Sequence, residues 1–286
     1  MTRTDSDPAV SRQSSATQRR WRWTRAVGAG LFDALLPKTC VACDRHWADR
    51  GGILCDDCTT RIEQLRATPY CGRCGRSMST LAIRTYDCPQ CMHERHWNVR
   101  RLVRVGPYAA PLRDMLISLK YHGEHRTAVA CGRGLAAAIK TEPWSSEIDL
   151  FVPVPMHYWR RLQRPCNHAD ALAEVVSRLL QIPLRRAAVH RPTYAPSQTQ
   201  ARSRAERFEH VKGSFAPTRK PGVSGKRVCI IDNVVVTGAT LHEVSKVLRK
   251  SGASKVFAAV FARAPMPGDL RFINPKAANA GSDPAA

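Results

Sequence analysis

The sequence predicts an α/β protein in which a parallel sheet flanked by helices follows a small cysteine-rich module. The length of 286 residues suits roughly two domains of ordinary size. Eight of the 11 cysteines form four Cys-x-x-Cys pairs, all of them before residue 92. Beyond about residue 98, short apolar runs alternate with amphipathic helical patterns, which is typical of a parallel sheet covered on both faces.

The first 22 residues are expected to form a disordered, basic arm. Met1 to Gln18 is rich in Ser, Thr, Arg and Asp and has no apolar period. No apolar run approaches the ~18 to 20 residues that cross a bilayer, and no apolar core of a secretory signal precedes Ala26. We therefore expect a cytoplasmic protein without a transmembrane segment.

The next module, residues 23–97, is expected to be a double zinc ribbon. Each Cys-x-x-Cys pair is a zinc knuckle. The first and second knuckles are separated by 11 residues, and the third and fourth by 13. Two knuckles bring four thiolates around one tetrahedral ion, so two structural zinc ions are expected. An iron–sulfur cluster is the chemical alternative, disulfides do not suit a cytosolic chain, and the spacing leaves the pairing of knuckles open. The expected ligands are Cys40, Cys43, Cys55 and Cys58, then Cys71, Cys74, Cys88 and Cys91.

Residues 98–265 are expected to form the α/β domain, and residues 266–286, rich in Pro, Ala, Gly and Asn, a flexible tail. Gly252 follows the last predicted helix at the position where a terminating glycine is common. Cys131, Cys166 and Cys229 have no partner of the knuckle kind and are read as small, semi-buried residues. Strands are predicted at 102–108, 148–155, 227–235 and 255–262, and helices at 110–121, 169–180 and 239–250.

The strand at 227–235 leads into the most informative turn of the sequence. Asp232 is followed by Thr237, Gly238 and Thr240 at the start of a helix. Backbone N–H groups at a helix start attract an anion, and Gly238 lets the backbone approach a phosphate closely. An ordinary Thr-capped helix after a strand would have the same spacing. The turn is therefore a candidate phosphate site.

This segment resembles the signature of type I phosphoribosyltransferases, in which two acids precede Val-x-Thr-Thr-Gly-x-Thr. The resemblance implies that the acids contact the ribose hydroxyls of phosphoribosyl pyrophosphate, bound with Mg²⁺, and that the turn holds its 5′-phosphate. Asn233 replaces the second acid and Val236 replaces the first Thr, so a negative charge near the sugar and a phosphate donor are removed. The binding residues it implies are Asp232, Asn233, Thr237, Gly238, Ala239 and Thr240.

The order of motifs from about residue 30 to 264 is similar to that of the ComF family of competence-associated proteins. These combine a double zinc ribbon with a phosphoribosyltransferase-like domain. The similar segments include 119–123 (Leu-Lys-Tyr-His-Gly), 152–157 (Val-Pro-Val-Pro-Met-His) and 164–169 (Arg-Pro-Cys-Asn-His-Ala). Membership would imply binding of single-stranded DNA and a role in natural transformation, with proteins of the DNA-uptake machinery as partners.

Basic residues are the expected contacts for both kinds of polyanion. The net charge of +22 and pI of about 10.2 favour nucleic acid, phosphorylated metabolites or an anionic membrane surface, although charge alone does not choose among them. Arg160, Arg161 and Arg164 follow the strand at 148–155. In the fold that the chain resembles, this turn lies near the pyrophosphate, so the resemblance implies that they hold a diphosphate, and they are also candidates for DNA contact; a solvated basic turn is the alternative. Further candidates for a DNA groove are Arg100, Arg101 and Arg104 with Trp97 and Tyr108, and Trp159 beside Arg160.

Two alternative functions remain open at this point. The chain could be an active phosphoribosyltransferase acting on an unidentified base or amine, or a sensor that binds the nucleotide precursor without chemistry. No general base or nucleophile constellation is evident, so no catalytic residue is assigned. We favour the DNA-uptake factor over the transferase because Asn233 weakens the predicted sugar site.

Overall fold

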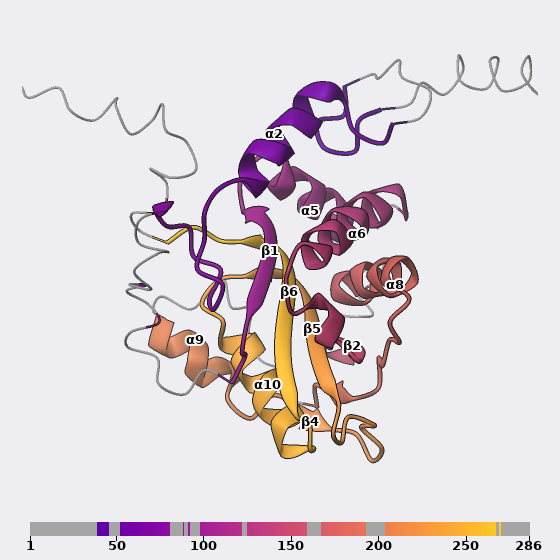
Figure 1. The fold of residues 1–286 in the computed structure, drawn as a ribbon, viewed down its shortest axis with the longest axis vertical. Helices are drawn as coiled ribbons and strands as arrows, with labels where there is room; N and C mark the ends of the chain where they lie inside the picture. Colours follow the sequence, from indigo (N-terminus) through magenta and orange to yellow (C-terminus); the bar gives the residue numbers. More distant parts are fainter. Residues whose placement is uncertain are drawn as a thin grey trace, which may run out of the picture.

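A four-stranded parallel sheet lies at the centre of the protein, in a computed structural model (Figure 1). The strand order is β1-β6-β5-β2, with β1 at Leu102–Pro107, β2 at Leu150–Pro153, β5 at Arg227–Val235 and β6 at Lys255–Arg263. A short antiparallel pair, β3 (Val189–His190) and β4 (Ala216–Pro217), lies apart from it. The structure describes residues 39–45, 52–80, 88, 91, 98–121, 125–158, 167–192, 204–266 and 269.

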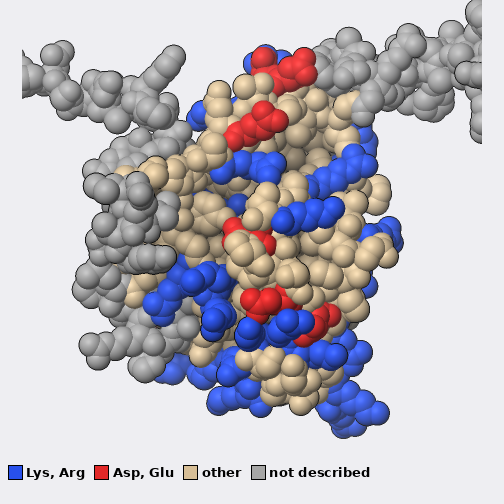
Figure 2. Space-filling view, in the orientation of Figure 1, with Lys and Arg blue, Asp and Glu red and all other residues tan. Residues whose placement is uncertain are grey.

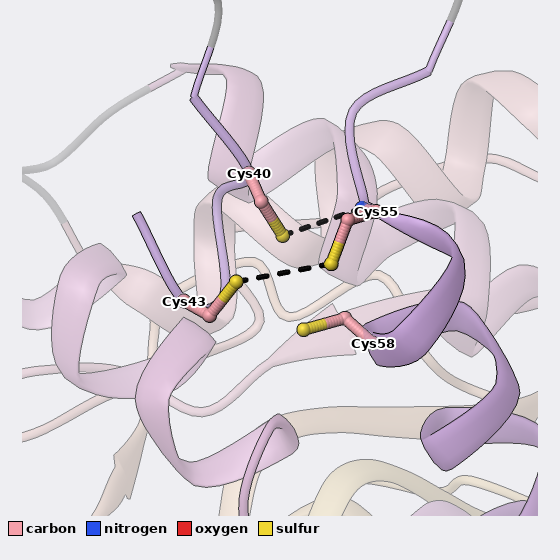
Figure 3. A group of neighbouring side chains, drawn as sticks. All are labelled: Cys40, Cys43, Cys55 and Cys58. Carbon is pink, nitrogen blue, oxygen red and sulfur yellow. Dashed lines mark hydrogen bonds between the residues drawn. The ribbon is translucent and has the colours of Figure 1, made fainter. Parts of the chain in front are cut away.

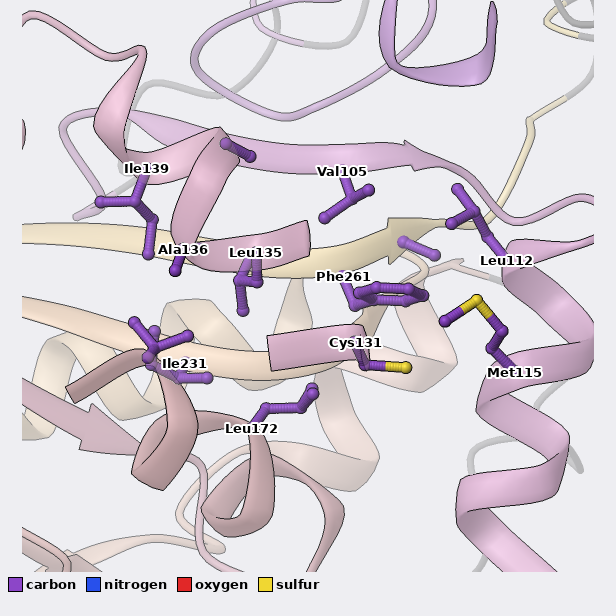
Figure 4. Close-up of a cluster of buried hydrophobic side chains, with 14 of the residues drawn as sticks. Val105, Leu112, Met115, Cys131, Leu135, Ala136, Ile139, Leu172, Ile231 and Phe261 are labelled. Atoms are coloured by element: carbon purple, nitrogen blue, oxygen red, sulfur yellow. The ribbon is translucent and has the colours of Figure 1, made fainter. Parts of the chain in front are cut away.

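Helices cover both faces of this sheet. On one face, residues of α5 (Leu112–Tyr121), α6 (His125–Lys140) and α8 (His168–Leu180) share an apolar cluster with β1, β5 and β6 (Figure 4). On the other face, α10 (Ala239–Lys250) packs its apolar side against alternate residues of the same strands. Because both faces are covered, the strands are almost continuously apolar, as the sequence predicts.

The predicted strands and helices of the α/β domain are all present, with shifts at several ends. β5 and α10 have the predicted bounds, and Gly252 has φ +93° just beyond α10. β2 is shorter than predicted at both ends, and the carboxylate of Asp149, the residue before it, accepts hydrogen bonds from the Arg227 guanidinium. α6 and the 3-10 turn η1 (Ser145–Glu147) are additional elements that the sequence analysis did not single out.

The first knuckle pair packs directly against the sheet domain. It includes the helix α2 (Asp56–Arg66), which lies beside β1, and Leu65 of α2 is 1% exposed. Cys40, Val41 and Ala42 belong to the same buried cluster as the residues of α5, α6 and β6. Two of the cysteines outside the knuckles, Cys131 and Cys229, are fully buried, whereas Cys166 lies outside the described residues.

The second knuckle pair is attached to the edge of the sheet. The backbone N–H of Leu102, at the start of β1, donates to the carbonyl of Gly72 at 2.8 Å. Among the helices that the structure describes, none combines the length and the apolar character needed to cross a bilayer.

Candidate functional site

The first four knuckle cysteines point their sulfurs toward one another (Figure 3). Cys40 and Cys43 come from a turn, whereas Cys55 and Cys58 lie at and within the first turn of α2. The Sγ atoms of Cys43 and Cys55 are 3.8 Å apart, and Cys40 Sγ accepts the N–H of Cys55 at 3.4 Å. All four sulfurs lie within 4.8 Å of one another.

The second four cysteines form an equivalent group. Cys71 and Cys91 are 3.8 Å apart at sulfur, and Cys74 and Cys88 are 3.6 Å apart. Four thiolates bound tetrahedrally at about 2.3 Å from zinc stand about 3.8 Å from one another, so both groups fit this ion. The structure thereby pairs the first knuckle with the second and the third with the fourth. Since each group already supplies four ligands, both sites are structural in kind.

The turn between β5 and α10 has the backbone of an anion-binding loop. Gly238 precedes α10 with φ +88°, a conformation that favours glycine, and its carbonyl accepts the N–H of His242 at 2.9 Å. The Thr237 hydroxyl accepts the N–H of Ala239 at 3.4 Å, so it draws the turn tight around the helix start. Thr237 and Ala239 are buried, while Thr240 is half-buried. The six residues implied by the resemblance thus lie in one continuous strand–turn–helix unit.

Asp232 is an acid buried within β5, five residues before Thr237. One carboxylate oxygen accepts the N–H of Asn233 at 2.8 Å. Burial raises the pKa of Asp232 to about 7, because the charged form loses its hydration, and the hydrogen bond from Asn233 offsets only part of this effect. Asn233, the residue that replaces the second acid, is half-buried.

The end of β2 lies next to β5. The N–H of Val154 donates to the carbonyl of Ile231 at 2.9 Å, and Asn167, before α8, donates from Nδ2 to the carbonyl of Val154 at 3.3 Å. Asn167 therefore ties the start of α8 to the carboxyl end of the sheet, where ligands of such sheets bind. The candidate residues Arg160, Arg161, Arg164 and Trp159 lie outside the described residues.

A short helix packs against the start of α10. The sequence favours a mobile loop or a short exposed helix between residues 192 and 213, and the structure places α9 at Arg204–Val211. The Phe208 ring lies 5.8 Å from the His242 ring, centroid to centroid, and the N–H of Gly213 donates to Glu243 of α10 at 3.1 Å. α9 and the residue that follows its end thus pack against the first turns of α10.

Arg104 corrects one expectation for the DNA groove. Arg100 and Arg101 are exposed, but Arg104 is only 3% exposed and cannot touch a strand of DNA. Its Nη2 donates to Ser77 at 2.9 Å, and the guanidinium lies over the Tyr70 ring at 4.9 Å. Burial lowers the pKa of Arg104 to about 10. The residue joins β1 to the second knuckle pair, which no periodicity in the sequence could indicate.

Basic side chains are spread over the face shown in Figure 2 and gather in its lower half, around α9 and α10. Acidic side chains on this face form small separate groups, one of them over α2. Basic side chains thus lie around the helix that follows the phosphate turn.

Two family models match this chain. A double zinc ribbon domain matches residues 31–93, and a phosphoribosyl transferase domain matches residues 169–270. Competence protein F of Haemophilus influenzae is 31% identical over 224 residues, which cover 76% of this chain and 93% of that protein. The chain belongs to the ComF family.

Other relatives agree with this assignment. The DNA utilization protein YhgH of Escherichia coli strain K12 is 29% identical over 74% of this chain and 88% of its own length. Competence protein ComFC of Bacillus subtilis is 23% identical over 70% of this chain and 79% of its own. A purine phosphoribosyltransferase structure from Pyrococcus horikoshii is 19% identical, covering 47% of this chain and 70% of that chain with a TM-score of 0.30. The two family models show that this ComF-family chain joins a double zinc ribbon to a phosphoribosyltransferase-like domain.

Proposed function

We propose that this protein binds phosphoribosyl pyrophosphate with Mg²⁺ at the turn between β5 and α10. The observation that carries the proposal is the backbone of that turn: Gly238 at φ +88° opens a 12-residue helix directly after Thr237. The helix dipole and the N–H groups at the helix start favour a phosphate there. Asp232 would accept hydrogen bonds from the ribose hydroxyls, with Asn233, Ala239 and Thr240 completing the site.

We further propose that the protein binds single-stranded DNA and assists DNA uptake in natural transformation, working in the cytoplasm. The names of two relatives, competence protein F and DNA utilization protein YhgH, support this role. The charge of +22 supports it physically, because cationic grooves hold the backbone of single strands. The contacts that we propose are the exposed Arg100 and Arg101, together with Arg160, Arg161 and Arg164.

The two departures from the signature favour binding over turnover. Asn233 removes a negative charge beside the sugar, and Val236 removes one hydroxyl donor from the phosphate turn. Phosphoribosyl transfer depends on electrostatic stabilisation of the separating diphosphate. Losing the charge and the donor should therefore lower the rate of transfer. The fold of the turn does not need either side chain, since the backbone and Gly238 form it.

The DNA proposal is tested by fluorescence anisotropy of a labelled oligothymidine with the zinc-loaded full chain. We expect roughly micromolar affinity that falls steeply from about 50 mM to about 200 mM salt. Replacing Arg160, Arg161 and Arg164 together by Ala should reduce the slope of log affinity against log salt by about 2, at about 0.7 per phosphate contact. The same titration with phosphoribosyl pyrophosphate and Mg²⁺ present shows whether both ligands bind together.

The matched control removes three exposed charges from α6 and α8, namely Arg133→Ala, Lys140→Ala and Arg178→Ala. This variant should bind DNA nearly as the wild type does. Equal losses in both triple variants would mean that net charge, not a groove, holds the DNA. An absence of binding near ~100 mM salt would reject the DNA proposal.

A further inference from the structure

Arg263, the last residue of β6, is among the largest of the fully buried side chains, at 1% exposure. A buried guanidinium is tolerated only where its donors are satisfied, and a planar fork of five N–H groups can join several chain segments at once. Neither the motifs nor the resemblance points to this residue. Its surroundings show what it connects.

The guanidinium of Arg263 donates to backbone carbonyls of two distant segments. Nε donates to the carbonyl of Cys74 at 3.2 Å. Cys74 is one of the four expected ligands in the second cysteine group. Nη1 donates to the carbonyls of Val235 at 3.3 Å and of Val236, the residue directly before Thr237. Nη1 also donates to the carbonyl of Ala264 at 3.0 Å. One side chain therefore spans from the zinc knuckle to the phosphate turn.

The knuckle backbone lies against the aliphatic part of the same side chain. Gly75 has φ +76°, and a Cβ at this position would lie 2.7 Å from Leu102 Cδ2 and 3.6 Å from Arg263 Cδ. The N–H of Gly75 donates to the carbonyl of Cys71 at 2.8 Å, so the packed glycine is part of the knuckle itself. The contact leaves little room for the knuckle to move without moving Arg263.

A second connection fixes the segment that follows β6. Arg76, next to the knuckle, forms an ion pair with Asp269 at 2.7 Å, and the Asp269 side chain is 1% exposed. The other Asp269 oxygen accepts the N–H of Met266 at 3.0 Å, and the N–H of Ala264 donates to the carbonyl of Val235 at 2.9 Å. The segment after β6 is thus bonded to the knuckle on one side and to the end of β5, where the turn begins, on the other.

We infer that Arg263 is a positioning residue that couples the third knuckle, Cys71 to Cys74, to the phosphate turn. By holding the carbonyl of Val236, it fixes the turn in the conformation that presents the helix start to a phosphate, so little ordering is needed on binding. The inference rests on the proposed binding of phosphoribosyl pyrophosphate at this turn. By linkage, zinc in the second group and phosphoribosyl pyrophosphate would each strengthen the binding of the other by the same factor.

The test compares Arg263→Met with Arg227→Met in the zinc-loaded full chain. The control makes the same change at the opposite end of the sheet, where β5 begins and Arg227 contacts Asp149. Hydrogen exchange of the ligand-free protein should be faster at residues 236–241 in Arg263→Met alone, with the amides of β5 near their wild-type rates. Calorimetry should show an affinity for phosphoribosyl pyrophosphate that is about tenfold or more weaker.

Arg263→Lys keeps the charge but not the fork of donors, so its exchange rates and affinity should lie between those of wild type and Arg263→Met. If Arg263→Met does not fold, the Arg263→Lys variant alone tests the positioning role. Transfer of zinc to a chromophoric chelator should be slowed by phosphoribosyl pyrophosphate in wild type but not in Arg263→Met.

Wild-type exchange at 236–241 and wild-type affinity in both Arg263 variants would overturn the positioning role. An unchanged rate of zinc transfer in wild type on adding saturating ligand would overturn the coupling. If the wild type binds no phosphoribosyl pyrophosphate, the proposed function fails, whereas the exchange comparison still decides whether Arg263 orders the turn.

Discussion

Asp232 is an acid at the end of an apolar run, and its burial governs how it can serve a ligand. With a pKa raised to about 7, the carboxyl holds a proton much more readily than an exposed aspartate does. The charged form accepts hydrogen bonds from ribose hydroxyls and favours Mg²⁺ nearby, so ligand binding should itself promote ionisation. The sequence predicts the acid and its place after a buried strand, but its pKa depends on packing by residues far along the chain.

Replacing Asp232 by Asn should change how stability depends on pH. The folded pKa lies above the ordinary value of 3.8, so folding takes up a proton and stability falls as the pH rises from 3.8 towards about 7. Between about pH 6 and about pH 8, urea denaturation should show that the wild type loses about 1 kcal/mol more free energy of unfolding than Asp232→Asn. Parallel stability curves for the two proteins would show that Asp232 is not protonated in this range.

At the scale of elements, β5 and α10 are predictable because their signals are local. An apolar run, a Thr-Gly turn and an amphipathic period follow one another, and the structure has the predicted bounds. α6 is harder to predict, because Gly132 and Gly134 interrupt its helical pattern. Its glycine at 132 is explained by tertiary packing: a Cβ there would lie 2.5 Å from Val175 Cβ of α8. Asp149 breaks an apolar run for a similar reason, since it accepts both the backbone N–H and the guanidinium of Arg227.

Two Gly→Ala substitutions in α6 should therefore have opposite effects. Gly134→Ala should raise the free energy of unfolding by about 0.5 to 1 kcal/mol, because its Cβ would meet nothing closer than 3.7 Å and alanine favours the helix. Gly132→Ala should lower it by about 1 to 3 kcal/mol, because the new methyl group overpacks the contact with Val175. Urea denaturation of both variants measures the difference. Stabilisation by both would contradict the close packing of α6 on α8.

At the scale of the whole molecule, the cysteine spacing predicts two modules but not how they join. The first knuckle pair shares a buried cluster with the sheet domain, which periodicity cannot reveal. The second is joined through Arg104, Arg263 and the Arg76–Asp269 pair. These contacts connect positions far apart in the sequence, and a buried arginine has no local pattern that distinguishes it from an exposed one. Zinc binding would thus stabilise an interface as well as two small ribbons.

The central claim is that the turn between β5 and α10 is a working phosphate site despite Asn233 and Val236. Calorimetric titration of the zinc-loaded chain with phosphoribosyl pyrophosphate and Mg²⁺ tests it most directly, with the Asp232→Ala/Thr237→Ala double variant as control. We predict saturable, Mg²⁺-dependent binding in the wild type that is lost in the variant. No heat of binding in the wild type, or equal binding in a folded double variant, would contradict the claim and leave the function to the basic surface and the zinc ribbons.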